Sequence, residues 1–126
     1  MEKISNKLMV VTGSIMLLVL GVFHGAFWEL FDWGNELPKL SRDNESLVQM
    51  MNICTITYLI SMGIILFISR SDIADSRVGR LLLLSLSVFF AVRLVLEFIF
   101  PDGSLVLAGI LLFLVVIFII PVLRKR

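Results

Sequence analysis

The sequence is poor in charge. Asp, Glu, Lys and Arg make up 17% of its 126 residues, whereas soluble domains carry about 25% charged residues. Apolar residues take up the difference: they form 59% of the chain, and the mean hydropathy is +1.03. This composition excludes an ordinary soluble domain and predicts an integral membrane protein. The formal net charge of +1 gives no reason to expect a nucleic-acid partner.

Cysteine and histidine each occur once, as Cys54 and His24. A single cysteine forms neither an intrachain disulfide nor a cysteine metal cluster. A single histidine cannot ligate haem through two imidazoles or build a multi-histidine zinc site within one protomer. We therefore expect no metal and no cofactor. An exposed nucleophile motif is also missing, so catalysis is the least favoured class of function.

Four apolar runs are long enough to cross a bilayer, which takes about 20 helical residues. Spanning segments must be helices or barrel strands, because lipid offers the backbone no hydrogen-bond partners. Strands would alternate polar and apolar residues, yet residues 111–120 are apolar throughout. The sequence therefore predicts an all-α fold, a four-transmembrane-helix bundle in one integral membrane domain over residues 1–126. The predicted spans are 8–30, 48–69, 81–100 and 104–123.

Basic residues are distributed unequally between the two sides of the predicted bundle. Eight lie in the tails and the second loop, and two, Lys39 and Arg42, lie in the first loop. Because cytoplasmic loops carry the excess of Lys and Arg, both termini are predicted to be cytoplasmic. The bias counts against exporters and channels that assemble as antiparallel dimers, since those insert in both directions. The eight residues are Lys3, Lys7, Arg70, Arg77, Arg80, Arg124, Lys125 and Arg126.

Polar side chains from three predicted spans fall at a similar depth. At 1.5 Å per residue, those of spans one and three lie at least roughly 18 Å from the inner ends of their helices. The polar residue of span two lies within roughly 6 Å of the outer boundary. The sequence therefore predicts an outward-facing polar cluster of His24, Glu29, Asn52, Arg93 and Glu97, flanked by Trp28 and Thr55.

Each member of this cluster also has a structural interpretation. Arg93 and Glu97 stand four residues apart, so they are either an ion pair that fixes packing or part of a binding site. His24 is either a hydrogen-bonded helix contact or a ligand or proton relay. Asn52 suits an interhelical hydrogen bond, and Glu29 suits a hydrated interface. Intramembrane ionisable groups are functional candidates by default, and their convergence from three spans favours a site.

Small residues predict where helices approach closely. Gly21 and Gly25 form a seam on span one, and Ser87 and Ala91 lie on the face of span three opposite the charged pair. Residues 101–103 predict a tight turn, so spans three and four should be antiparallel neighbours. Candidate helix caps are Ser41, Asp43 or Asn44 before span two and Asp75 or Ser76 before span three.

A broader pattern extends over span one, the first loop and the start of span two, with one further position in span three. It resembles a pattern in small, uncharacterised four-span membrane proteins of bacteria. The resemblance implies a four-helix architecture and a bacterial inner (plasma) membrane, and it implies no substrate. Its positions are His24, Phe27, Trp28, Phe31, Trp33, Leu37, Leu40, Ser41, Asn44, Gln49, Asn52 and Arg93.

Two main hypotheses about function remain. In the first, a non-enzymatic membrane protein binds a lipid headgroup, a small anion or a partner helix; Arg93 would attract the anionic group, and a homo-oligomer or a partner membrane protein would supply the helix. In the second, a small proton-coupled transporter or channel subunit exchanges protons at His24 and Glu97, since histidine titrates near neutral pH. The inner half of the bundle has few polar residues, which counts against a path across it.

Overall fold

A computed structural model describes residues 2–100 and 103–124, and in these residues every regular element is a helix. Four long helices dominate: α1 (Glu2–Gly25), α4 (Arg42–Ile68), α6 (Arg77–Ile99) and α7 (Leu105–Leu123). All four are long and apolar enough to cross a membrane, which confirms the predicted all-α fold with four candidate spans. The short elements are α2 (Phe27–Leu30), α3 (Trp33–Glu36), η1 (Leu37–Lys39) and α5 (Arg70–Asp75).

The helix ends differ from the limits of the apolar runs. Helix α1 ends at Gly25, before residue 30, and the short helix α2 follows it. Asp32, between α2 and α3, adopts a left-handed conformation with φ 48°. Helices α4 and α6 begin ahead of their apolar runs because serines cap them. Ser41 Oγ accepts from the Asn44 amide at 3.4 Å, and Ser76 Oγ accepts from the Gly79 amide at 2.9 Å. Capped polar turns thus extend both helices beyond the apolar stretch.

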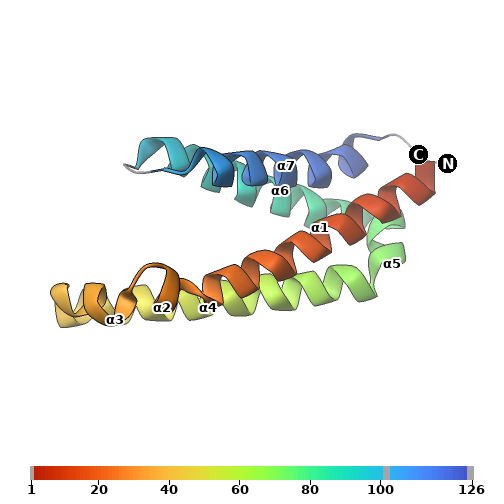
Figure 1. The fold of residues 1–126 in the computed structure, drawn as a ribbon. Coiled ribbons are helices and arrows are strands. Elements are labelled where there is room, and N and C mark those ends of the chain that lie inside the picture. The colour runs from red at the N-terminus through yellow and green to blue at the C-terminus, as the bar shows by residue number, and fades with distance from the viewer. Residues whose placement is uncertain (1, 101–102, 125–126) are drawn as a thin grey trace. The chain divides into compact units, whose positions relative to one another are not determined.

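The chain forms two compact units. Unit 1 draws on Met1–Gly13 and Leu66–Arg126, and unit 2 is Ser14–Ile65. In unit 1, α6 and α7 lie side by side as antiparallel neighbours (Figure 1). The predicted tight turn between them, Pro101-Asp102-Gly103, falls largely outside the described residues.

The contact between α6 and α7 uses a small side chain and two aromatic rings. Ser87, buried as expected of a close helix contact, donates from Oγ to the Val115 carbonyl at 3.1 Å. Phe90 stacks on Phe118 with ring centroids 6.1 Å apart, and both rings are buried. An added Cβ on Gly13 would overlap the Phe118 ring, so the start of α1 packs closely there. These contacts form the core of unit 1.

The ends of the described chain also meet in unit 1. Arg124 donates from Nη1 to Ser5 Oγ at 2.8 Å and to Asn6 Oδ1 at 3.1 Å. An even number of crossings would place both ends of the chain on one side of a membrane. The contact agrees with that arrangement.

Unit 2 contains the second part of α1 and most of α4, which pack through glycines. A Cβ on Gly21 would come within 2.6 Å of Ile60 Cδ1, and one on Gly63 would come within 2.8 Å of Leu18 Cδ2. Gly25 faces open space instead. The predicted seam is therefore half right: Gly21 makes the close contact from α1, and Gly63 of α4 extends it.

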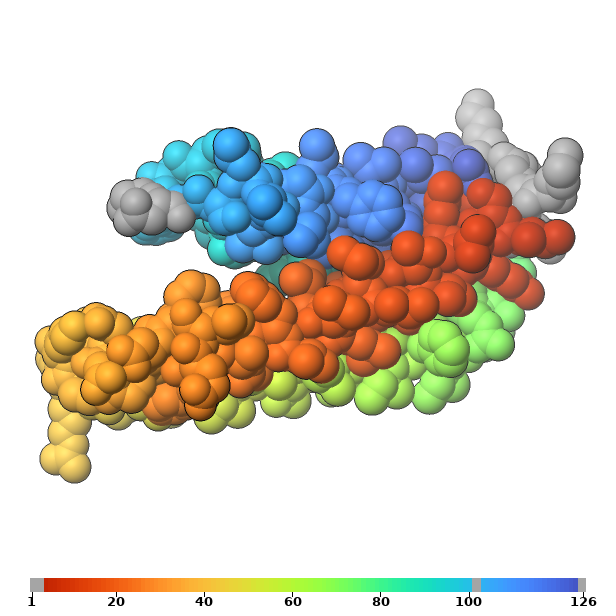
Figure 2. Space-filling view, viewed as in Figure 1, coloured from red at the N-terminus to blue at the C-terminus, as the bar shows by residue number. Residues whose placement is uncertain are grey.

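The long helices expose hydrocarbon. On α7, the blue helix in Figure 2, the exposed residues include Leu105, Val106, Leu112, Phe113 and Val116. Soluble proteins rarely leave large apolar surfaces in water. Lipid tails are the natural cover for such surfaces, as the sequence predicts.

Candidate functional site

The charged pair of α6 is held at the start of α7. Arg93 Nη1 lies 2.6 Å from Glu97 Oε2, as expected for positions one helical turn apart. The other carboxylate oxygen, Oε1, accepts from the Ser104 backbone amide at 2.7 Å. Ser104 is itself the cap of α7, because its Oγ accepts from the Leu107 amide at 3.3 Å. Glu97 therefore joins α6 to the start of α7 and also holds the Arg93 side chain.

The two partners differ in exposure. The Glu97 side chain is 8% exposed, whereas the Arg93 side chain is 43% exposed. A carboxylate beside the positive end of a helix is favourably placed, so Glu97 has both a cation and a helix terminus to satisfy it. Arginine carries five N–H donors, and Glu97 takes only part of this capacity. The result is a fixed guanidinium with a surface left to bind another acceptor.

Asn52 makes the predicted kind of helix contact in unit 2. It is 8% exposed, and its Nδ2 donates to the His24 backbone carbonyl at 3.0 Å. The contact joins α4 to the end of α1. Carbonyls near a helix C-terminus lack intrahelical partners, so a side-chain amide suits this position.

The His24 ring is oriented by its own helix and by an aromatic neighbour. Nδ1 lies 2.8 Å from the Leu20 carbonyl; because a carbonyl only accepts, this nitrogen carries the hydrogen. The ring stacks on Phe27 with centroids 4.6 Å apart. Phe27 in turn meets Trp33 edge to face at 5.7 Å. In the neutral ring, Nε2 is then the hydrogen-bond acceptor, and the Leu20 and Phe27 contacts fix the direction in which it points.

The flanking residues take separate roles. Trp28 is 46% exposed and meets Trp33 edge to face at 5.6 Å, an arrangement suited to the membrane interface. Glu29 is exposed. Thr55 Oγ1 donates to the Met51 carbonyl of its own helix at 2.9 Å.

The structure pairs four members of the predicted cluster, two within each unit. Arg93 and Glu97 are paired in unit 1, and His24 and Asn52 in unit 2. Their convergence into one site stays a prediction. Ser104 was missed by the sequence reasoning, although a serine directly before a long apolar run is a recognisable helix-start signal.

Across residues 2–100 and 103–124, no group of three or more His, Cys, Asp or Glu side chains is placed to hold a metal ion. Comparison with protein-family models, with curated proteins and with solved structures finds no match to this chain.

Proposed function

We propose that this chain is a multi-pass protein of the bacterial inner membrane, with both termini cytoplasmic, that binds the phosphate of a lipid headgroup through Arg93 in the outer leaflet. The orientation is supported by the excess of Lys and Arg in the tails and the second loop. The bacterial membrane is supported by the resemblance of the first half of the chain to small four-span bacterial proteins.

The observation that carries the proposal is the asymmetric exposure of the Arg93–Glu97 pair. Glu97 is nearly enclosed and has a partner on each oxygen, whereas Arg93 is half-exposed. A guanidinium fixed by one acceptor loses little further side-chain freedom when it binds a second. Its planar fork suits phosphate oxygens, which it contacts through two parallel hydrogen bonds. Glu97 is thus a positioning residue for Arg93.

Two other kinds of ligand could occupy the Arg93 site. A small anion would satisfy Arg93 without acyl chains, and a partner helix or a second copy of the chain would satisfy it with a carboxylate or carbonyl. The proton-coupled transporter or channel subunit is less favoured. Both oxygens of Glu97 already accept hydrogen bonds, which suits positioning better than proton exchange.

The test is native mass spectrometry of the gently solubilised protein, with phosphatidylglycerol as the added lipid and inorganic phosphate as the small-anion arm. Wild type is compared with Arg93→Gln and with Arg93→Ala/Glu97→Ala. The matched control is Arg42→Gln, because Arg42 is an exposed arginine assigned to the same side of the membrane. We expect wild type and the control to retain one more bound phospholipid than either Arg93 variant.

Three results would contradict the proposal in different ways. Inorganic phosphate that displaces the lipid would make the site an anion site. An altered oligomeric mass in the Arg93 variants would indicate a helix partner. Equal lipid retention in all variants, with lower stability of the Arg93 variants alone, would make the pair a purely structural one.

A further inference from the structure

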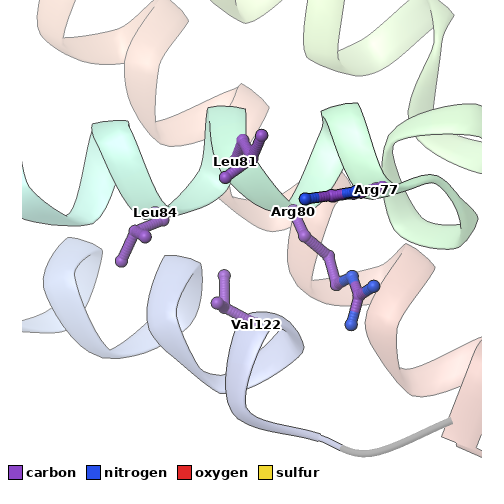
Figure 3. Close-up of a pocket in the computed structure, with 5 residues that line it drawn as sticks. All are labelled: Arg77, Arg80, Leu81, Leu84 and Val122. Atoms are coloured by element: carbon purple, nitrogen blue, oxygen red, sulfur yellow. The ribbon is translucent and has the colours of Figure 1, made fainter.

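A second cationic site lies in unit 1, at the start of α6 and the end of α7. A surface cavity of about 210 Å³ is lined by Arg77, Arg80, Leu81, Leu84 and Val122. Figure 3 shows the first four on α6 and Val122 on α7. Each of these α6 positions has another three and four residues away (77–80, 81–84, 77–81 and 80–84), so they share one helix face. One face therefore carries two cations and then two leucines.

The guanidinium groups of Arg77 and Arg80 are available to bind a ligand. Among the described residues, neither the Arg77 nor the Arg80 side chain has a hydrogen bond or an ion pair. The contrast with other arginines is clear: Arg93 is paired with Glu97, Arg124 contacts Ser5 and Asn6, and Arg70 donates to the Phe67 carbonyl.

The apolar part of the cavity continues toward the middle of the helices. Leu81 is 59% exposed and Leu84 38% exposed; Leu84 points toward the side of α7 that carries Val122 (Figure 3), and all three residues line the cavity. A charged end followed by a hydrocarbon floor matches the order of groups in a phospholipid, with the phosphate at the surface and the acyl chain deeper. Free phosphate would use only the charged end.

We infer that Arg77 and Arg80 bind the headgroup phosphate of an anionic phospholipid whose acyl chain lies along Leu81, Leu84 and Val122. Basic pockets between membrane helices are known to hold anionic headgroups, and each Lys or Arg near the surface contributes about 1 kcal/mol to attraction by anionic lipid. The site is distinct from Arg93, which lies near the other end of α6.

The experiment measures lipid retention by the full-length protein in mass spectra, with phosphatidylglycerol, phosphatidylcholine and inorganic phosphate added in separate arms. The variant is Arg77→Gln/Arg80→Gln. The matched control is Arg42→Gln/Arg70→Gln, which removes the same charge from two exposed arginines outside the cavity. An Arg93→Gln sample is measured in parallel. It should lose the lipid bound at Arg93 and keep the lipid bound in the cavity, so the two sites are counted separately.

We expect phosphatidylglycerol to bind this cavity about 30-fold more weakly in the Arg77→Gln/Arg80→Gln variant, or about 2 kcal/mol at 1.4 kcal/mol per tenfold change. The control should bind as wild type does, and phosphatidylcholine should bind weakly to every form. Equal phosphatidylglycerol retention by the variant and the wild type overturns the inference, as does displacement of the lipid by inorganic phosphate. Circular dichroism of both double variants separates lost binding from lost folding, and Leu84→Asn provides a second variant that weakens the acyl contact while keeping both arginines.

Discussion

The Ser104 amide donates to Glu97 Oε1 at 2.7 Å, so a carboxylate near the end of α6 receives the first amide of the α7 cap. Arg93 occupies the other oxygen of the same carboxylate. One side chain therefore has two separable tasks: it closes the α6–α7 hairpin, and it fixes the guanidinium.

The two tasks of Glu97 predict a graded series of variants. Glu97→Ala removes both contacts and leaves the Arg93 charge unpaired, so we expect a loss of about 2 to 3 kcal/mol in stability. Glu97→Gln keeps an acceptor for the Ser104 amide, so its loss should be smaller. Thermal unfolding in one detergent measures the series, with Glu36→Gln at the exposed end of α3 as the control. Equal losses for Gln and Ala would mean that the Ser104 contact contributes nothing.

Close packing of Gly13 on Phe118 gives a steric prediction. The Phe118 ring is fully buried and stacked on Phe90, so it cannot move aside easily for a new methyl group. We expect Gly13→Ala to cost about 1 to 3 kcal/mol, as overpacking does in other cores. Gly109→Ala is the matched control: it meets nothing within 4 Å and should gain about 0.5 to 1 kcal/mol from helix propensity. A stable Gly13→Ala protein would contradict the contact.

The proposed orientation predicts which loops react with an impermeant thiol reagent. In a Cys54→Ala background, a cysteine at Asn44 should be labelled in intact cells, whereas one at Asp75 should be labelled only after the membrane is opened. The reason is the side assigned to each loop by the excess of basic residues. The reverse pattern would put Arg93 near the cytoplasmic face and remove the basis for an outer-leaflet lipid.

A double-mutant cycle tests whether the Arg93–Glu97 and His24–Asn52 pairs form one site. Asn52→Ala, Arg93→Ala and the double variant form a cycle in which lipid retention and thermal stability are both recorded. A single site predicts a coupling energy above about 0.5 kcal/mol, whereas independent pairs give additive effects. Strict additivity in both measurements would leave Arg93 and Glu97 as a site of their own.

The helical fold was predictable because its signals are long and redundant. Four apolar runs can satisfy their backbones in lipid only as helices, and serines such as Ser76 mark a helix start by residue type alone. The end of α1 was harder to predict. The first predicted span runs to residue 30, yet α1 stops at Gly25, the separate short helix α2 follows, and the chain turns through Asp32, a backbone change that hydropathy does not report.

Contacts of the candidate site within one helix were predictable from residue spacing. Contacts between two helices were not. Positions four apart on one helix must lie close together, so the Arg93–Glu97 pair followed from the sequence. The Glu97–Ser104 contact needed the geometry of the hairpin connection. The Asn52 bond goes to a backbone carbonyl of His24, and every residue offers such a carbonyl, so residue types gave no indication of this partner.

The composition of unit 1 from two distant segments has a consequence for biosynthesis. Residues 2–13 leave the ribosome more than 100 residues before Phe118 and Arg124, which they contact. Unit 2 uses one continuous stretch and can form while translation continues. Unit 1 must wait until residues 66–124 have been made, and until then the start of α1 depends on the insertion machinery or on lipid for its neighbours.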